Sequence, residues 1–179
     1  MSKTSEFLIA GFGGQGVLFC GKFLVYTGLI QDQQVSWLPS YGPEMRGGTA
    51  NCSVIISDTP VGSPIVTKPT DLIAMNGPSL DKFEDSVKAG GRIFVESSLI
   101  ERKVARDDVQ VFYVPATRLA EENDLKGLAN MILMGKVLRE TGICPHELIK
   151  EAMTKTVPAK KMALFEANLR AVELGYQVD

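Results

Sequence analysis

The sequence is poor in the residue types that usually carry catalysis or bind metals. It has a single histidine, His146, and three scattered cysteines without C-x-x-C spacing, Cys20, Cys52 and Cys144. Cysteines of this kind are typical of buried thiols in a cytosolic protein, and they cannot by themselves hold an iron–sulfur cluster. His146 lies at an expected helix start and is interpreted as an exposed residue, not as a base. Because no Ser/His/Asp set or metal-ligand cluster is recognisable, we expect neither a catalytic nor a metal site on this chain.

A strong charge of one sign and long hydrophobic runs are also missing. The net charge of −2 gives no reason to expect nucleic acid or an acidic membrane surface as a partner. No apolar run approaches the about 18 residues of a transmembrane helix, and residues 1–6 lack the apolar core of a signal peptide. With 45% hydrophobic residues and no visible linker, residues 1–179 are expected to form a single cytoplasmic domain.

A glycine-rich turn, G-F-G-G-Q-G at residues 11–16, is the clearest feature that is present. It follows an apolar run at residues 7–10 and precedes a helix-length segment. Glycines allow a sharp turn, close approach of a ligand and tight packing of the next helix, whose free N–H groups favour an anion. The candidate binding residues of this turn are Gly11, Gly13, Gly14, Gln15 and Gly16. The alternative is a purely structural turn in which Gln15 bonds to a neighbouring backbone.

A second Gly/Pro-rich segment, S-Y-G-P-E-M-R-G-G at residues 40–48, follows an expected strand at about 34–38. If this strand and the first one are neighbours in a parallel sheet, both segments meet at the rim where open α/β sheets bind ligands. The candidate binding residues here are Ser40, Tyr41, Glu44, Arg46 and Gly47. Arg46 would contact a phosphate-type anion. The alternative is an internal pair between Arg46 and Glu44 that shapes an interface loop, since arginine pairs with carboxylates as readily as with phosphates.

Ordinary NAD binding is not expected at the glycine-rich turn. The turn matches the pattern G-x-G-x-x-G, but this match alone is weak evidence. A dinucleotide site also needs an acidic residue at the end of the second strand, for the ribose hydroxyls. Here that strand ends in Pro39 and Ser40, whereas Asp32 lies ahead of it, at the wrong end.

The alternation of strands and helices predicts a three-layer α/β fold with a mainly parallel sheet. Strands are expected at residues 7–10, 34–38, 72–75, 92–96 and 109–114, and helices at 17–30 and 79–89. Residues 50–56 and 61–66 flank a turn and are interpreted as an inserted antiparallel β-hairpin. From residue 116 onward the chain is expected to be helical, with helices at 116–123, 127–140, 145–154 and 159–174.

Two of the expected helical regions are unusually apolar. The segment 17–30 is apolar on almost every side, so it is either central or buried in an interface. Met131, Met134 and Met153 lie in or near late helices with broad apolar faces. Core packing is the simpler interpretation and a subunit contact is the alternative. If such surface is exposed, the isolated chain should form a closed symmetric dimer.

Four segments occur together in an order that is specific for one family. They are G-F-G-G-Q-G-V, S-Y-G-P-E-M-R-G-G-T-A, V-I-I-S-D-T-P-V-G-S-P and the late helix that contains Asn130. By these segments the chain resembles the gamma subunit of 2-oxoacid:ferredoxin oxidoreductases over essentially its whole length. The segment E-M-R-G-G-T-A-N-C is most similar to that of the 2-oxoglutarate branch. The branched-chain 2-oxoacid branch is a close competitor, and pyruvate-type subunits tend to differ where this chain has Met45.

The resemblance implies a heteromeric complex that converts a 2-oxoacid and coenzyme A to acyl-CoA and carbon dioxide, with electrons passed to ferredoxin. It further implies that thiamine diphosphate and Mg²⁺ are held by alpha and beta subunits. Iron–sulfur clusters would lie in beta and in a ferredoxin-like delta subunit where one exists. This chain would then bind no cofactor alone and would contact at most coenzyme A. The alternative from another class is a stand-alone nucleotide- or anion-binding regulatory module.

Overall fold

The computed structural model describes residues 3–40 and 49–179 and shows a six-stranded sheet in the order β2-β3-β1-β4-β5-β6. The strands are β1 Thr4–Phe12, β2 Gln34–Ser40, β3 Thr49–Ser57, β4 Asp71–Ala74, β5 Arg92–Glu96 and β6 Gln110–Val114. The helices are α1 Val17–Leu29, α2 Gly77–Phe83, α3 Ala116–Glu122, α4 Ala129–Thr141, α5 Ile149–Thr156 and α6 Met162–Tyr176, with 3₁₀ turns η1 Glu84–Ser86 and η2 His146–Leu148. Along the described ranges, no helix is long and apolar enough to cross a membrane.

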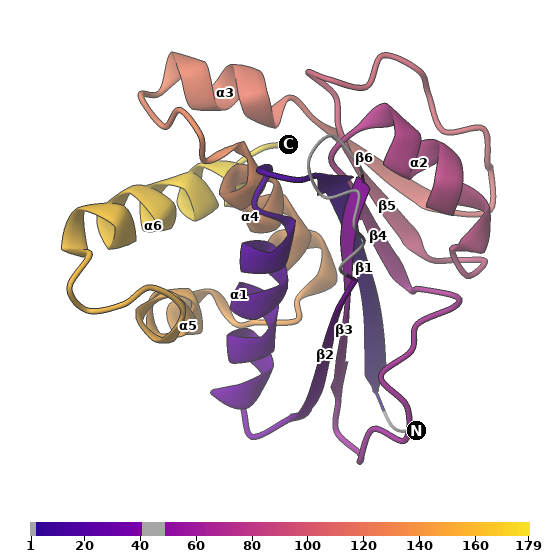
Figure 1. The fold of residues 1–179 in the computed structure, drawn as a ribbon, viewed down its shortest axis with the longest axis horizontal. Coiled ribbons are helices and arrows are strands. Elements are labelled where there is room, and N and C mark those ends of the chain that lie inside the picture. The colour runs from indigo at the N-terminus through magenta and orange to yellow at the C-terminus, as the bar shows by residue number, and fades with distance from the viewer. Residues whose placement is uncertain (1–2, 41–48) are drawn as a thin grey trace.

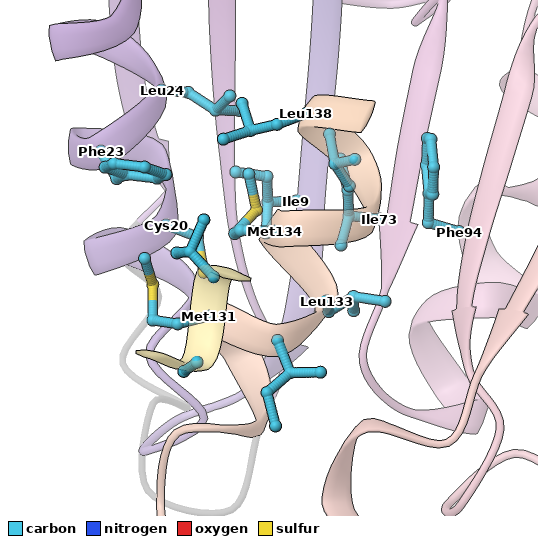
Figure 2. Close-up of a cluster of buried hydrophobic side chains, with 14 of the residues drawn as sticks. Ile9, Cys20, Phe23, Leu24, Ile73, Phe94, Met131, Leu133, Met134 and Leu138 are labelled. Atoms are coloured by element: carbon cyan, nitrogen blue, oxygen red, sulfur yellow. The ribbon is translucent and has the colours of Figure 1, made fainter. Parts of the chain in front are cut away.

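Helices cover both faces of the sheet (Figure 1). α1 and α4 pack on one face, with α5 and α6 outside them, and α2 packs on the other face. Because successive strand residues point to opposite faces, Phe7 and Ile9 of β1 join the core under α1 and α4, while Leu8 joins the core under α2. In Figure 2, side chains of α1 and α4 meet those of the central strands in the larger core. The predicted three-layer α/β class is confirmed.

The sheet is more mixed than the sequence predicted. β1, β4, β5 and β6 form three parallel pairings, whereas β2–β3 and β3–β1 are antiparallel. The predicted hairpin partner of β3 is therefore wrong: β3 pairs with β2 and β1, and residues 61–66 form no strand. Both edges of β3 are already occupied, and the segment after it contains Pro60, Pro64 and Pro69, which cannot donate a backbone hydrogen bond.

The helical C-terminal part is confirmed, and its methionines are core residues. Met131, Met134 and Met153 are fully buried, so core packing is the correct interpretation and a subunit contact through them is wrong. The helix predicted at 79–89 is shorter and begins earlier. Its start is set by Asn76, whose Oδ1 accepts a hydrogen bond from the backbone N of Ser79 at 2.8 Å.

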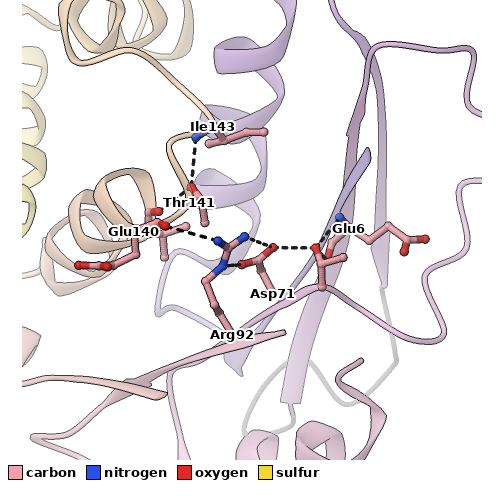
Figure 3. Close-up of polar contacts among 8 residues, drawn as sticks. Glu6, Asp71, Arg92, Glu140, Thr141 and Ile143 are labelled. Atoms are coloured by element: carbon pink, nitrogen blue, oxygen red, sulfur yellow. Dashed lines mark hydrogen bonds and ion pairs between the residues drawn. The ribbon is translucent and has the colours of Figure 1, made fainter. Parts of the chain in front are cut away.

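An ion pair between Asp71 and Arg92 connects the C-terminal end of α4 to the amino ends of β4 and β5 (Figure 3). Asp71, at the start of β4, accepts a hydrogen bond from Arg92 Nε at 2.5 Å and one from Thr70 Oγ1 at 2.6 Å. Arg92 Nη1 also donates to the backbone carbonyl of Glu140 at 3.4 Å. Since Asp71 is fully buried, its charge is stabilised only while Arg92 stays in place. The network therefore holds the C-terminal end of α4, whose other end reaches the site described next.

Candidate ligand-binding site

The glycine-rich turn joins β1 to α1 at the carboxyl edge of the sheet. Gly14 and Gly16 have φ angles of 95° and 76°, in the left-handed region that favours glycine. Gly16 is the N-cap of α1 and supplies no side-chain cap, and the first turn of the helix has no acidic residue. The first bond within the helix is from Cys20 N to Gly16 O. The preceding N–H groups, from Val17 to Phe19, are thus free of intrahelical partners, as at any helix start.

Gln15 holds the turn against the sheet. Its Oε1 accepts a hydrogen bond from Phe12 N at 2.6 Å, and its Nε2 donates to the carbonyl of Met75 at 3.0 Å. Gln15 therefore links the end of β1 to the residue that follows β4, which is the structural role considered for this side chain from the sequence. A Cβ on Gly11 would lie 2.6 Å from Gln15 Oε1 and 2.9 Å from Met75 Cβ, so Gly11 permits this close approach.

Asn130, at the start of α4, contacts the turn from the other side. Its Nδ2 donates to the carbonyl of Gly16 at 3.4 Å. A Cβ on Gly16 would lie only 2.3 Å from that Nδ2 atom, so the turn and α4 pack together because residue 16 is glycine. Asn130 was singled out from the sequence only through the family resemblance, and no spacing rule connects it to a turn more than a hundred residues away.

Two cavities open on either side of Gly14. The first, here called the α1 cavity, has a volume of about 270 Å³ and lies at the N-terminal end of α1. The described residues that line it are uncharged: Phe12, Gly13, Gly14, Gly16, Val17, Leu18, Phe19 and Ala50. The second, here called the α3–α4 cavity, has a volume of about 290 Å³. Its wall includes Gly14 and Gln15 on one side and residues of α3 and α4 on the other.

The second predicted segment is placed differently from the expectation. β2 runs in the same direction as β1 and ends at the same edge, but β3 lies between them, so the two are not neighbours. At about 4.8 Å per strand, their ends are about 10 Å apart. Ser40 is exposed at the end of β2, opposite Asn51. Tyr41, Glu44, Arg46 and Gly47 lie outside the described residues, and their proposed contacts stay predictions.

The reason for this arrangement is the composition of the two strands. β3 is buried along nearly its whole length, with Cys52 and Val54 on one face and Ile55 on the other. β2 exposes 40% of Trp37 and 40% of Leu38. β3 takes the inner position because its apolar face, which includes Cys52 and Val54, buries more surface there than that of β2 would.

Glu96 is a site residue that the sequence reasoning missed. It is the last residue of β5, is 2% exposed and lines the α3–α4 cavity. Its carboxylate accepts hydrogen bonds from Ser98 N at 3.1 Å, from Thr117 N at 3.2 Å and from Thr117 Oγ1 at 2.8 Å. The sequence did contain one indication of this role. Glu96 is an acidic residue at the end of an expected strand, and parallel strands end at the same edge of a sheet as the glycine-rich turn.

The thiols and the histidine are placed as the sequence predicts. Cys20, Cys52 and Cys144 are all buried and free. Burial raises the pKa of the Cys52 thiol to about 12 and that of Cys144 to about 11, so neither forms a nucleophilic thiolate at neutral pH. His146 is exposed, and its Nε2 lies 2.9 Å from Glu173 Oε2.

The fold and the site define a class: a three-layer α/β domain with two cavities at the carboxyl edge of its sheet. The particular family follows from comparison with known proteins. The profile of the pyruvate ferredoxin/flavodoxin oxidoreductase family matches residues 6–178, and the chain belongs to this family.

Named relatives narrow the class of subunit. The chain is 36% identical over 181 residues to the 2-oxoglutarate synthase subunit KorC of Methanocaldococcus jannaschii, covering 99% of this chain and 95% of KorC. It is 40% identical over 169 residues to the ketoisovalerate oxidoreductase subunit VorA of Methanothermobacter thermautotrophicus, covering 93% of this chain. The match spans only 35% of VorA, about a third of its length.

A solved structure supports the same assignment. The gamma subunit of a keto/oxoacid ferredoxin oxidoreductase from Geobacter sulfurreducens matches with a TM-score of 0.81 and 29% identity, covering 97% of this chain and 96% of that one. The resemblance to gamma subunits of 2-oxoacid:ferredoxin oxidoreductases is thereby confirmed.

Proposed function

We propose that this gamma-type subunit serves an oxidoreductase that converts 2-oxoglutarate and coenzyme A to succinyl-CoA and carbon dioxide, with electrons passed to ferredoxin. The observation that carries the proposal is the match to KorC, which extends over 95% of that subunit, whereas the match to VorA spans 35%. Thiamine diphosphate, Mg²⁺ and iron–sulfur clusters would be held by alpha and beta partners, and by a delta subunit where one exists. Branched-chain 2-oxoacids and pyruvate are the alternative substrates.

The role of this chain would be to position coenzyme A rather than to carry the chemistry. The α1 cavity supports this role because it lies at a helix N-terminus, where backbone N–H groups and the helix dipole favour a phosphate. Gly13, Gly14 and Gly16 would let the phosphate approach the backbone. Arg46 is proposed from the sequence alone as a second contact, alongside Ser40, Tyr41, Glu44 and Gly47.

The first prediction tests this function by reconstitution. The purified chain should be colourless and inactive, and 2-oxoglutarate- and coenzyme-A-dependent viologen reduction should appear only after the alpha and beta subunits are added. The assay should compare 2-oxoglutarate, 2-oxoisovalerate and pyruvate under the same conditions. Turnover by this chain alone would contradict the proposal. A preference for 2-oxoisovalerate or pyruvate would assign the chain to the branch of the family that acts on that substrate. Nucleotide binding by a chain that never associates with such partners would favour the regulatory-module alternative.

The second prediction concerns self-association of the isolated chain. With Met131 and Met134 buried, the candidate surface is the edge strand β2, which carries no charged residue and exposes Trp37 and Leu38. Unprotected edges of this kind tend to pair, so we propose a closed dimer. Light scattering at micromolar concentration should give the dimer mass, and Leu38→Lys should shift it to monomer. Leu164→Lys is the matched control, because Leu164 is 39% exposed on α6. A monomeric wild-type chain would contradict the proposal.

A further inference from the structure

The α3–α4 cavity lies where three adjacent parallel strands end. Gly14 and Gln15 follow β1, Met75 follows β4, and Glu96 ends β5. β1, β4 and β5 are consecutive in the sheet and parallel. Open α/β sheets bind ligands at this edge. The volume of about 290 Å³ is close to the lower limit of about 300 Å³ for small-molecule sites, so the cavity suits one group of a larger ligand.

The walls of this cavity do not suit a phosphate. Part of the wall is apolar, from Met75, Ala129 and Leu133. Within the part of the chain that the structure describes, the charged lining residues are Glu96, Glu121 and Lys126, two acidic against one basic. Glu96 is almost completely buried and is fixed by its hydrogen bonds to Ser98 and Thr117, so its carboxylate stays beside the cavity. A second negative group placed beside it would be repelled in a medium of low dielectric constant.

The α1 cavity, which shares Gly14 with the α3–α4 cavity, differs from it in charge. Among residues 3–40 and 49–179, those that line it carry no charged side chain, and it faces the N-terminal end of α1. Gly14 belongs to the wall of both cavities, and a Cβ built on it would meet nothing within 4 Å. Because residue 14 has no side chain and has open space around it, it places no side chain between the two cavities. The turn is also rigid, because Gln15 bonds to Phe12 and Met75, and Asn130 bonds to Gly16.

We infer that the α3–α4 cavity binds an uncharged, largely apolar group of a phosphate-containing ligand whose phosphate lies in the α1 cavity. Two groups share this chemistry: a nucleobase with its ribose, and an amide-containing arm such as pantetheine. Met75 suits either one, because its thioether adapts in shape and makes favourable contacts with aromatic rings. The inference rests on the proposed function for the phosphate in the α1 cavity and for naming coenzyme A, which carries both groups. It adds that two parts of the ligand are recognised separately: the phosphate in the α1 cavity and the uncharged group in the α3–α4 cavity.

The test uses the full chain with three separate probes: adenosine, pantetheine and inorganic pyrophosphate. Their binding is measured by ligand-observed NMR or calorimetry. Ala129→Leu places extra volume in the cavity wall without changing charge or the glycine-rich turn. Ala163→Leu is the matched control, on an exposed position of α6. We expect at least one neutral probe to bind and to be weakened at least tenfold by Ala129→Leu. Pyrophosphate binding should stay unchanged, and Ala163→Leu should affect none of the probes.

The results separate this inference from the proposed function. If adenosine alone responds to Ala129→Leu, the nucleoside end occupies the cavity; if pantetheine alone responds, the arm does. The inference is overturned if neither neutral probe binds the wild-type chain, or if both bind equally well to a folded Ala129→Leu variant. Competition between pyrophosphate and the neutral probe for the same cavity would also overturn it. A complex that lacks 2-oxoglutarate activity while these probes behave as expected would refute the proposed function and leave the inference standing.

Discussion

Gly175→Ala should lower the free energy of unfolding by about 3 kcal/mol, at the upper end of the range for overpacked cores. A Cβ at this position would lie 1.7 Å from the carbonyl oxygen of Ile132, at the crossing of α4 and α6. Gly135 is in the same situation, with a Cβ 2.0 Å from the carbonyl oxygen of Val172. Backbone atoms cannot rotate away as a flexible side chain does, so the two helices must separate. This cost outweighs the about 1 kcal/mol by which alanine is favoured over glycine inside a helix.

Urea unfolding of the purified variants measures this effect. Gly62→Ala is the control, because a Cβ there would meet nothing within 4 Å. It should change stability by less than about 0.5 kcal/mol, as is usual for surface substitutions. Equal stabilities of Gly175→Ala and Gly62→Ala would mean that α4 and α6 are not as close as described. Because α4 carries Ala129, Asn130 and Leu133 of the site, Gly175→Ala should also weaken ligand binding.

Gly16→Ala is expected to have an effect of similar size, and it acts at the site itself. A left-handed backbone costs a non-glycine residue about 1–2 kcal/mol, and Gly16 has a φ of 76°. In addition, the new Cβ would lie 2.3 Å from Asn130 Nδ2 and 3.0 Å from its Cγ. We expect a total destabilisation of about 2–5 kcal/mol, since overpacking adds about 1–3 kcal/mol to the cost of the backbone angle. In the assembled enzyme the KM for coenzyme A should rise about tenfold, equivalent to about 1.4 kcal/mol, while the KM for the 2-oxoacid should barely change.

Two further variants separate the causes of this effect. Asn130→Ala removes the clashing atoms, and the remaining Cβ at 3.7 Å is in ordinary contact. The double variant Gly16→Ala/Asn130→Ala should therefore be less destabilised than the sum of the single variants, by about 1 kcal/mol. Gly142→Ala measures the cost of the backbone angle alone, because Gly142 has a φ of 60° and open space around it. If Gly16→Ala is no more costly than Gly142→Ala, the contact with Asn130 is not what constrains residue 16.

Local elements and the glycine-rich turn could be predicted from the sequence. β5 begins and ends at Arg92 and Glu96, as the apolar run indicates, and α1 begins directly after Gly16. The helices after residue 116 also lie close to their predicted positions, because proline and glycine mark their ends. These features depend on short-range rules: side-chain periodicity, backbone angles that only glycine adopts readily, and helix termination. The burial of the three cysteines follows in the same way from their apolar surroundings.

Only the tertiary structure decided which strands are neighbours and which residues meet. The sequence alone placed β2 beside β1, but β3 buries its apolar face more completely than β2 and takes the inner position between them. The periodicity of a strand specifies its faces, whereas the choice of partner depends on how much surface the whole sheet buries. The meeting of Asn130 with Gly16, and of Glu96 with the same edge, depends on packing between distant segments. The sequence by itself therefore determined the family resemblance and the glycine-rich turn, and the packing of α3 and α4 beside that turn determined the shape and charge of the α3–α4 cavity.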